Sequence, residues 1–153
     1  MLAVLGGLFL VLVCIDMGIK QYIEEYFKEG QEQETVIDQV VLRKVYNRGF
    51  LLNTFDKYPL IVKGVSAALG IGIAIYDGCL LLKKRRWLRK LGMAFLTAGA
   101  FSNIYDRLIR GKVIDYIGVK SKHKYLSTLT ANLADIYVVI GGVIVMVAKM
   151  FRR

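Results

Sequence analysis

Four long apolar segments dominate this chain and constrain its fold more than any other feature. They cover roughly residues 2–23, 60–82, 88–108 and 132–150. A helix of a soluble protein carries a polar stripe, whereas the run from Leu60 to Ile75 has almost none. About 20 apolar residues in a helix cross a bilayer core, so each segment is long enough to span a membrane. Hydrophobic residues make up 56% of the sequence, against roughly 45–50% in soluble domains, and the sequence predicts an α-helical polytopic membrane protein with four transmembrane helices.

The polar stretch at residues 24–59 is the extramembrane insertion that we expect between the first two spans. β-branched residues are frequent from Thr35 to Tyr46, and Asn47-Arg48-Gly49 has the composition of a turn. We therefore expect short strands that form a small β-rich cradle on the membrane surface. The stretch from Ile109 to Thr130 is expected to be a loop, and residues 1–153 to form a single membrane domain.

Small residues recur in the second apolar segment at four-residue spacing: Gly64, Ala68 and Gly72. In a membrane, small residues at this spacing let helices approach closely where lipid supplies no hydrophobic driving force. Pro59 stands just before the segment, where a proline suits the first turn of a helix.

The positions of the basic residues predict the orientation of the chain. Its formal net charge is +10, and six of the eight residues from 83 to 90 are Lys or Arg. Lys149, Arg152 and Arg153 close the last apolar segment. Because cytoplasmic loops are enriched in such residues, both termini are predicted to be cytoplasmic and residues 24–59 extracytoplasmic. The loop after the third span is also basic and departs from this bias. Basic clusters beside apolar segments suit anionic lipid headgroups, and no nucleic acid partner is expected.

A disulfide, a zinc site and a cleaved leader are not expected. Cys14 and Cys79 lie in apolar segments near opposite membrane faces, too far apart to be bridged. His123 is the only histidine and the cysteines are not closely spaced, which leaves too few zinc ligands. The first apolar segment lacks a basic region before it and a small-x-small site after it, so it is expected to be retained as a span.

Ionisable and amide side chains gather at one end of the predicted spans. They are Asp16 and Lys20 in the first span, Asn103, Asp106 and Arg107 in the third, Asp115 just beyond it, and Asn132 and Asp135 opening the fourth. Such residues are costly in a membrane and usually functional, and those three or four apart share a helix face. Lys63 and Asp77 lie apart from the group, and we expect their side chains to extend toward the membrane interfaces.

Carboxylates are the most plentiful reactive groups in this cluster. Two carboxyls that share a site cannot both ionise easily, so one can activate water while the other protonates a leaving amine. Taken singly, several of these residues also have structural explanations. Asp135 suits the start of a helix, Asp106 and Arg107 suit an interfacial ion pair, and Asp16 with Lys20 suits a structural pair.

Two other functions fit part of the pattern. A small proton- or cation-coupled transporter is the alternative, because acids within spans also mark ion pathways. Against it, the charged groups gather at one leaflet and no inverted repeat is visible. A non-catalytic membrane adaptor would leave the Asn–Asp spacings unexplained.

Four stretches resemble, in order, the motifs of the lipoprotein signal peptidase (signal peptidase II) family of bacterial intramembrane aspartic proteases. Ile15-Asp16 with Lys20 is similar to the first motif, and Asn47-x-Gly49 to the second. The third is Gly99-Ala100-x-x-Asn103-x-x-Asp106-Arg107, continued by Gly111-x-Val113-x-Asp115, and the fourth is Asn132-x-Ala134-Asp135. The sequence departs from the usual pattern at Met17, Ile19, Phe50, Ser102 and Ala131. These departures leave every proposed carboxylate in place and bear on substrate preference.

The resemblance implies a peptidase of the bacterial cytoplasmic membrane that removes signal peptides before a diacylglyceryl-modified cysteine. It implies Asp115 and Asp135 as the catalytic pair. The implied supporting residues are Asp16, Lys20, Asn47, Asn103, Asp106, Arg107 and Asn132. No metal or cofactor is expected. The expected partners are a lipid-modified preprotein and the bilayer, and the chain is expected to be a monomer.

Overall fold

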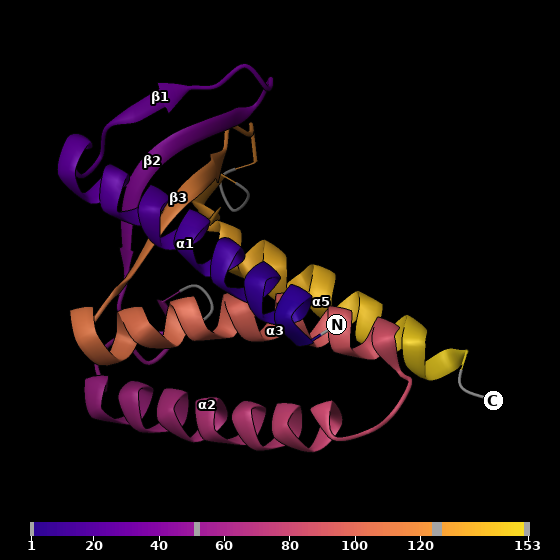
Figure 1. Ribbon diagram of the computed structural model, residues 1–153. Coiled ribbons are helices and arrows are strands. Elements are labelled where there is room, and N and C mark those ends of the chain that lie inside the picture. Colours follow the sequence, from indigo (N-terminus) through magenta and orange to yellow (C-terminus); the bar gives the residue numbers. More distant parts are fainter. Residues whose placement is uncertain (1, 51–52, 124–126, 152–153) are drawn as a thin grey trace.

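Four long helices are joined to one small sheet in the computed structural model, which describes residues 2–50, 53–123 and 127–151 (Figure 1). The helices are α1 (Leu2–Tyr26), α2 (Pro59–Leu81), α3 (Trp87–Tyr105) and α5 (Leu133–Met150). A π-helical turn, η2 (Asp106–Arg110), continues α3. The start of α1 and the end of α5 lie at the same end of the bundle, and the sheet lies toward the opposite end (Figure 1).

Three of these helices, α1, α2 and α5, are long and apolar enough to cross a membrane. The chain is therefore a helical membrane protein with a small sheet, and three of the four predicted spans are supported by length and composition. Helix α3 differs because it contacts α1, α2 and α5. It buries polar as well as apolar residues, including Lys90, Ser102 and Asn103, so a large part of its surface faces protein. A helix surrounded in this way need not be as apolar as one that faces lipid.

The helix ends agree closely with the apolar pattern. Pro59 occupies the first turn of α2, as expected. The third segment, predicted to run to residue 108, ends as an α-helix at Tyr105 and continues through η2 to Arg110. Gly111 then adopts a left-handed conformation (φ +73°), which glycine adopts without a steric cost, and the chain turns into the sheet.

The sheet is antiparallel, with the order β1-β2-β3-β4. Its strands are β1 (Glu32–Glu34), β2 (Val40–Asn47), β3 (Val113–Val119) and β4 (Thr130–Ala131). Strands were expected in the insertion, and β2 confirms this. The expectation that Ile109 to Thr130 is a loop was wrong, because this stretch supplies β3 and β4. Five of the seven residues of β3 are buried, so the strand lacks the alternation that marks a half-exposed strand.

Helices α3 and α5 approach each other at three glycines. A Cβ at Gly99 would collide with the carbonyl oxygen of Ala134, and one at Gly141 would collide with the backbone of α3. A Cβ at Gly92 would lie 2.9 Å from the carbonyl oxygen of Gly141. The absence of a side chain at Gly99 thus allows the start of α5, with the motif Asn132-x-Ala134-Asp135, to lie close against α3.

Two small residues of α2, Gly64 and Gly72, face open space. No described heavy atom lies within 4 Å of where a Cβ would stand at Gly64 or Gly72. At these two positions no other helix of the described chain approaches closely. Asp77 does not extend toward an interface, because its Oδ2 accepts a hydrogen bond from the Thr97 hydroxyl of α3.

An apolar cluster connects the sheet to the helices. Ile23 and Phe27, at the end of α1, pack with Ile114 and Tyr116 of β3. Successive side chains of a strand point to opposite faces, so this packing turns Asp115, between the last two, away from the cluster. The packing of Ile114 and Tyr116 therefore sets the direction in which the Asp115 side chain points.

Candidate active site

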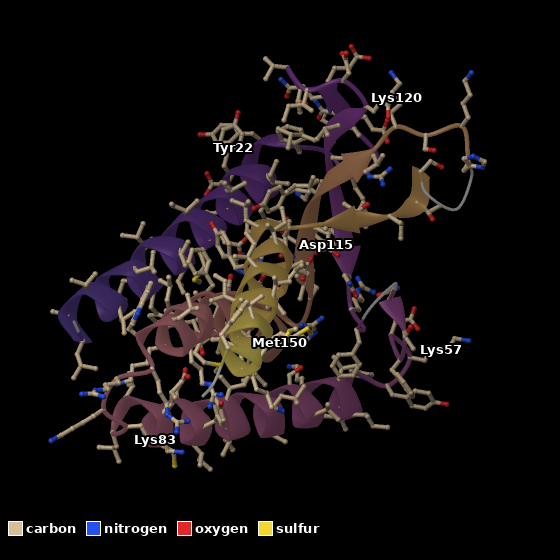
Figure 2. The ribbon with its side chains drawn as sticks, turned by 90° about the vertical axis from the view of Figure 1, so that its right-hand side faces the viewer. Tyr22, Lys57, Lys83, Asp115, Lys120 and Met150 are labelled. Atoms are coloured by element: carbon tan, nitrogen blue, oxygen red, sulfur yellow. The ribbon has the colours of Figure 1, made fainter. Side chains whose placement is uncertain are left out.

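Asp115 lies where the sheet meets the helices (Figure 2). The sequence placed this residue in a loop, and that expectation was wrong, because Asp115 belongs to β3 and pairs with Val45 of β2. Its side chain is buried, with 5% of the residue exposed. A strand holds a side chain in a more defined direction than a surface loop does.

The side chain of Asn132 joins Asp115 to the start of α5. Its Nδ2 donates a 2.7 Å hydrogen bond to Oδ1 of Asp115. Its Oδ1 accepts a 3.0 Å bond from the backbone N–H of Asp135, and Oδ2 of Asp135 accepts one from the backbone N–H of Asn132. These reciprocal bonds form a capping box, which satisfies N–H groups that a helix start leaves without partners. The local structure that begins α5 thus also positions Asp135 relative to Asp115.

Two further amides complete the contacts of the carboxylates. Asn103 donates from Nδ2 to Oδ1 of Asp135 at 2.8 Å, and Asn47 donates from Nδ2 to Oδ2 of Asp115 at 3.2 Å. The Nδ2 of Asn132 also lies 3.2 Å from Oδ1 of Asn103. Each carboxylate therefore accepts hydrogen bonds at both oxygens, and three of the predicted supporting residues contact the predicted pair directly.

The pKa of Asp115 is raised from its ordinary value to about 6. Burial is the largest cause, and the negative charge of Asp135 adds to it. The hydrogen bonds from Asn47 and Asn132 act in the opposite direction, because they favour the charged carboxylate. Asp115 can therefore hold a proton close to neutral pH, as a general acid must.

A buried charged cluster lies next to the carboxylates and amides. It consists of Asp16, Lys20 and Asp106. Lys20 Nζ lies 2.7 Å from Asp16 Oδ2 and 2.9 Å from Asp106 Oδ2, and all three side chains have 0% exposure. Arg110 adds a second positive charge 3.2 Å from Asp106 Oδ1. Two cations thus balance two anions, which a charge cluster needs where water is excluded.

This buried cluster contacts the candidate catalytic region through Asn103. Lys20 Nζ donates a 2.9 Å hydrogen bond to Asn103 Oδ1, whose amide nitrogen faces Asp135. Neither Asp16 nor Asp106 has a direct hydrogen bond to Asp115 or Asp135 among the described contacts. The predicted site residues therefore form two groups. The amides contact Asp115 and Asp135 directly, and the charged cluster reaches them through Asn103.

Sequence reasoning did not identify Tyr116 and Ser102 as parts of the site. The Tyr116 hydroxyl donates to Asp16 Oδ1 at 3.0 Å and accepts from the backbone N–H of Leu133 at 3.1 Å. Ser102 donates to the other oxygen of Asp16. Ser102 precedes Asp106 by four residues on one helix, a spacing that puts both on one face and was a usable signal. Nothing in the sequence pattern distinguishes Tyr116 from an ordinary core residue of a strand.

Arg107 connects the site to the segment that follows β2. Its Nε donates to the carbonyl oxygen of Gly49 at 3.1 Å, and its guanidinium lies 5.4 Å from the ring centroid of Phe50. Among the described residues, Arg107 makes no ion pair within 4.0 Å of a carboxylate. Arg107 thus binds the segment at Gly49 and Phe50. Its positive charge interacts with the carboxylates only at distances beyond 4.0 Å.

The described residues contain no group of three or more His, Cys, Asp or Glu side chains arranged to hold a metal ion. The carboxylates and amides are the reactive groups that the described contacts bring together. That the chain needs no metal or cofactor stays a prediction.

The helices and the sheet, with the buried carboxylates between them, define a small helical membrane protein. The family model for signal peptidase (SPase) II matches residues 8–152. The chain therefore belongs to the signal peptidase II family, which makes it a membrane protease. The resemblance drawn from the four motifs is confirmed.

Related proteins and solved structures agree with this assignment. The chain is 28% identical over 144 residues to a lipoprotein signal peptidase of Fusobacterium nucleatum, covering 94% of this chain and 84% of the relative. It is 32% identical over 139 residues to one of Sinorhizobium fredii, covering 87% and 78%. A solved bacterial membrane enzyme superposes with a TM-score of 0.83 at 20% identity, covering 97% of this chain and 88% of that one. At this identity the superposition shows that the fold is shared.

Proposed function

We propose that Asp115 and Asp135 are an aspartic catalytic dyad that removes signal peptides from lipid-modified preproteins. Cleavage would fall immediately before the lipid-bearing cysteine. The observation that carries the proposal is the position of Asn132, whose side chain bonds both to Asp115 and to the backbone of Asp135. One amide thus sets the relation between two acids that lie 20 residues apart in the sequence.

The environments of the two acids suit different roles. Asp115 is buried and its pKa is raised, so it holds the proton and acts as the general acid. Asp135 is half-buried and lies in the first turn of α5, where the helix dipole favours a negative charge, which suits a carboxylate acting as the general base. The negative charge of Asp135 adds to the raised pKa of Asp115, so the two acids are expected to work together.

The reaction then needs only water and the two carboxyls. Asp135 takes a proton from water as the water oxygen bonds to the scissile carbonyl carbon. Asp115 gives its proton to the carbonyl oxygen, and the tetrahedral intermediate then collapses as the C–N bond breaks. The leaving amine receives the proton from Asp135, and the proton of the intermediate's hydroxyl returns to Asp115. Both carboxyls are thereby restored to their starting states.

We further propose four transmembrane spans, with α3 as the fourth, and a site at the extracytoplasmic face. The placement of α3 among the other three helices supports a spanning role despite its polar residues. The basic residues at 83–90 and Lys149 lie at the opposite end of the bundle from the sheet, and their cytoplasmic placement would put the site outside. A bacterial cytoplasmic membrane location and a monomer complete the proposal.

Cleavage of a lipidated reporter by the reconstituted protein tests the dyad. Asp115→Asn and Asp135→Asn keep the size of each side chain, but replace the ionisable carboxyl with a neutral amide that has one acceptor oxygen. Each should abolish cleavage while the protein still inserts in the membrane. Asp38→Asn, at an exposed position between β1 and β2, is the matched control and should cleave normally. Wild-type activity in either dyad variant would remove that residue from the catalytic role, and a reporter without lipid tests whether lipid is required.

A further inference from the structure

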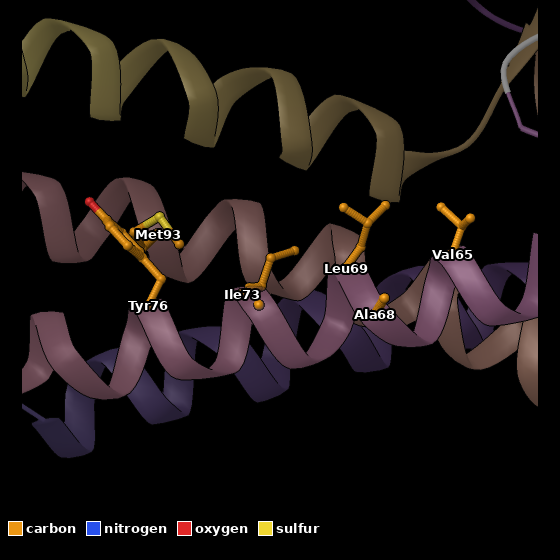
Figure 3. A pocket seen from close by; sticks show the side chains of 7 residues that line it. Val65, Ala68, Leu69, Ile73, Tyr76 and Met93 are labelled. Atoms are coloured by element: carbon orange, nitrogen blue, oxygen red, sulfur yellow. The ribbon is translucent and has the colours of Figure 1, made fainter.

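An open apolar groove runs along the side of α2 that faces α3. It has a volume of about 450 Å³, and its lining residues are Val65, Ala68, Leu69, Gly72, Ile73, Tyr76 and Met93 (Figure 3). The small side chains of Ala68 and Gly72 leave the hollow, and no described atom fills the place of a Cβ at Gly72. Tyr76 and Met93 stand together at one end, and Val65 stands at the other (Figure 3).

The length of the groove suits a single acyl chain. Val65 and Tyr76 are about 16 Å apart along the helix axis, at ~1.5 Å per residue. The hydrocarbon of one leaflet is about 15 Å thick, half of the bilayer core. The groove ends at Tyr76, about 8 Å before the end of α2 at Leu81, which leaves room for a glycerol and a phosphate beyond it.

A basic turn follows the end of α2 beyond Tyr76. Lys83, Lys84 and Arg85 are exposed, and Lys83 is labelled at the end of α2 in Figure 2. None of these three cations has a carboxylate within 4.0 Å among the residues that the structure describes. Lys90 differs, since it is buried and its Nζ donates to the carbonyl oxygen of Leu81 at 3.1 Å. Lys90 therefore caps α2, and the three exposed cations remain available to a ligand.

We propose that the groove and the basic turn, Lys83 to Arg85, together bind one anionic phospholipid. One acyl chain lies along α2 from Tyr76 to Val65, and the phosphate contacts the basic turn. Basic segments beside membrane helices attract anionic lipids, with each Lys or Arg contributing to the attraction. An apolar hollow on the helix that precedes such a segment adds contact along the chain of the lipid.

Charge argues for a lipid over a signal peptide in this groove. A signal peptide carries a basic region before its apolar segment. If its apolar segment lay along α2 with that region at the level of Lys83 to Arg85, like charges would face each other. A phosphate at the same place would meet opposite charge. The site goes beyond the proposed peptidase activity and does not depend on the catalytic residues.

Lipid titration of the purified protein followed by native mass spectrometry tests the proposal. Dioleoyl phosphatidylglycerol should bind at least about tenfold more tightly than dioleoyl phosphatidylcholine, because the cations contact its net negative headgroup. Changing Lys83, Lys84 and Arg85 to Gln should remove this preference. Exposed Lys28, Lys57 and Lys122 lie elsewhere, and their simultaneous change to Gln is the matched control that should keep it.

The groove is tested by a pair of glycine variants in α2. Gly72→Leu fills the hollow and should weaken dioleoyl phosphatidylglycerol binding about tenfold, whereas Gly64→Leu, in an equally open place outside the groove, should not. Equal binding of the two lipids, or equal effects of the two glycine variants, overturns the proposal. Reduced reporter cleavage by Gly72→Leu with unchanged lipid binding also overturns it and assigns the groove to the substrate.

Discussion

Lys20 determines which way the Asn103 amide faces. Its ammonium group donates to Oδ1 of Asn103 at 2.9 Å, and the Nδ2 of the same amide donates to Asp135 at 2.8 Å. An ammonium group can only donate, so a flipped amide would place two donors against each other. The buried cluster around Lys20 is thus coupled to the orientation of a candidate catalytic carboxylate.

Replacing Lys20 with Met should destabilise the protein strongly. The change leaves Asp16 and Asp106 as buried acids without their common partner, and breaking a buried pair in this way costs about 3–5 kcal/mol. The measurement is thermal unfolding in detergent, where a large fall in the midpoint is expected. Lys28→Met, at an exposed position of the chain, is the control. A midpoint equal to wild type would contradict the role of Lys20 in the cluster.

Gly99→Ala should displace the start of α5 and impair cleavage. The added Cβ would collide with the carbonyl oxygen of Ala134, which immediately precedes Asp135. Overpacking of this kind costs about 1–3 kcal/mol, and the backbone shift would also move a carboxylate that the capping box holds in place. Gly142→Ala is the matched control, because no described atom lies within 4 Å of its Cβ position. Equal thermal midpoints and cleavage rates for the two variants would show that the α3–α5 contact tolerates a methyl group.

Arg107→Lys should lower cleavage efficiency without unfolding the protein. Lysine keeps the positive charge but loses the Nε bond to Gly49 and the planar group that faces Phe50. Loss of a hydrogen bond and a cation–π contact, each about 1 kcal/mol, corresponds to roughly a tenfold to thirtyfold decrease in kcat/KM. Phe50→Leu should show a smaller decrease, since only the aromatic contact is lost. Unchanged kcat/KM in Arg107→Lys would mean that charge alone is required there.

The raised pKa of Asp115 predicts how stability depends on pH. Its ordinary pKa is 3.8 and its pKa in the folded protein is about 6, so between these values the folded state binds a proton that the unfolded state has released. The contribution of this group to stability is therefore fully present below pH 3.8 and declines as the pH rises through 6, by roughly 3 kcal/mol in total. Asp115→Asn should flatten this part of the profile. Parallel profiles of unfolding free energy for wild type and variant between pH 4 and 7 would contradict the assignment.

The helices could be predicted from the sequence because apolar length is a strong local signal. The ends of α1, α2 and α5 follow the change from apolar to polar residues within a few positions. Strand β3 could not be predicted in the same way, since its residues are buried on both faces and it lies between basic stretches. Its partner β2 comes from a distant part of the chain, and this pairing is a tertiary property.

The candidate site was predictable in its members but not in its arrangement. Helix spacing grouped Asn103 with Asp106 and Arg107. Asn103 and Asp106 do share a contact with Lys20, whereas Arg107 contacts Gly49 and Phe50. The π-helical turn that begins at Asp106 changes the helical periodicity at this point, which the sequence does not reveal. The small residues of α2 carry a signal for close helix packing, yet no described atom lies within 4 Å of a Cβ position at Gly64 or Gly72.

A double-mutant comparison of reporter cleavage tests most directly whether Asp115 and Asp135 act together as one catalytic pair. Asp115→Asn, Asp135→Asn and the combined variant should be measured under single-turnover conditions in the same reconstituted membranes. If the two acids act as one unit, each single variant should lose about as much activity as the double variant, because groups that act as a unit are not additive. Losses that multiply in the double variant, or substantial cleavage by either single variant, would contradict a shared catalytic site.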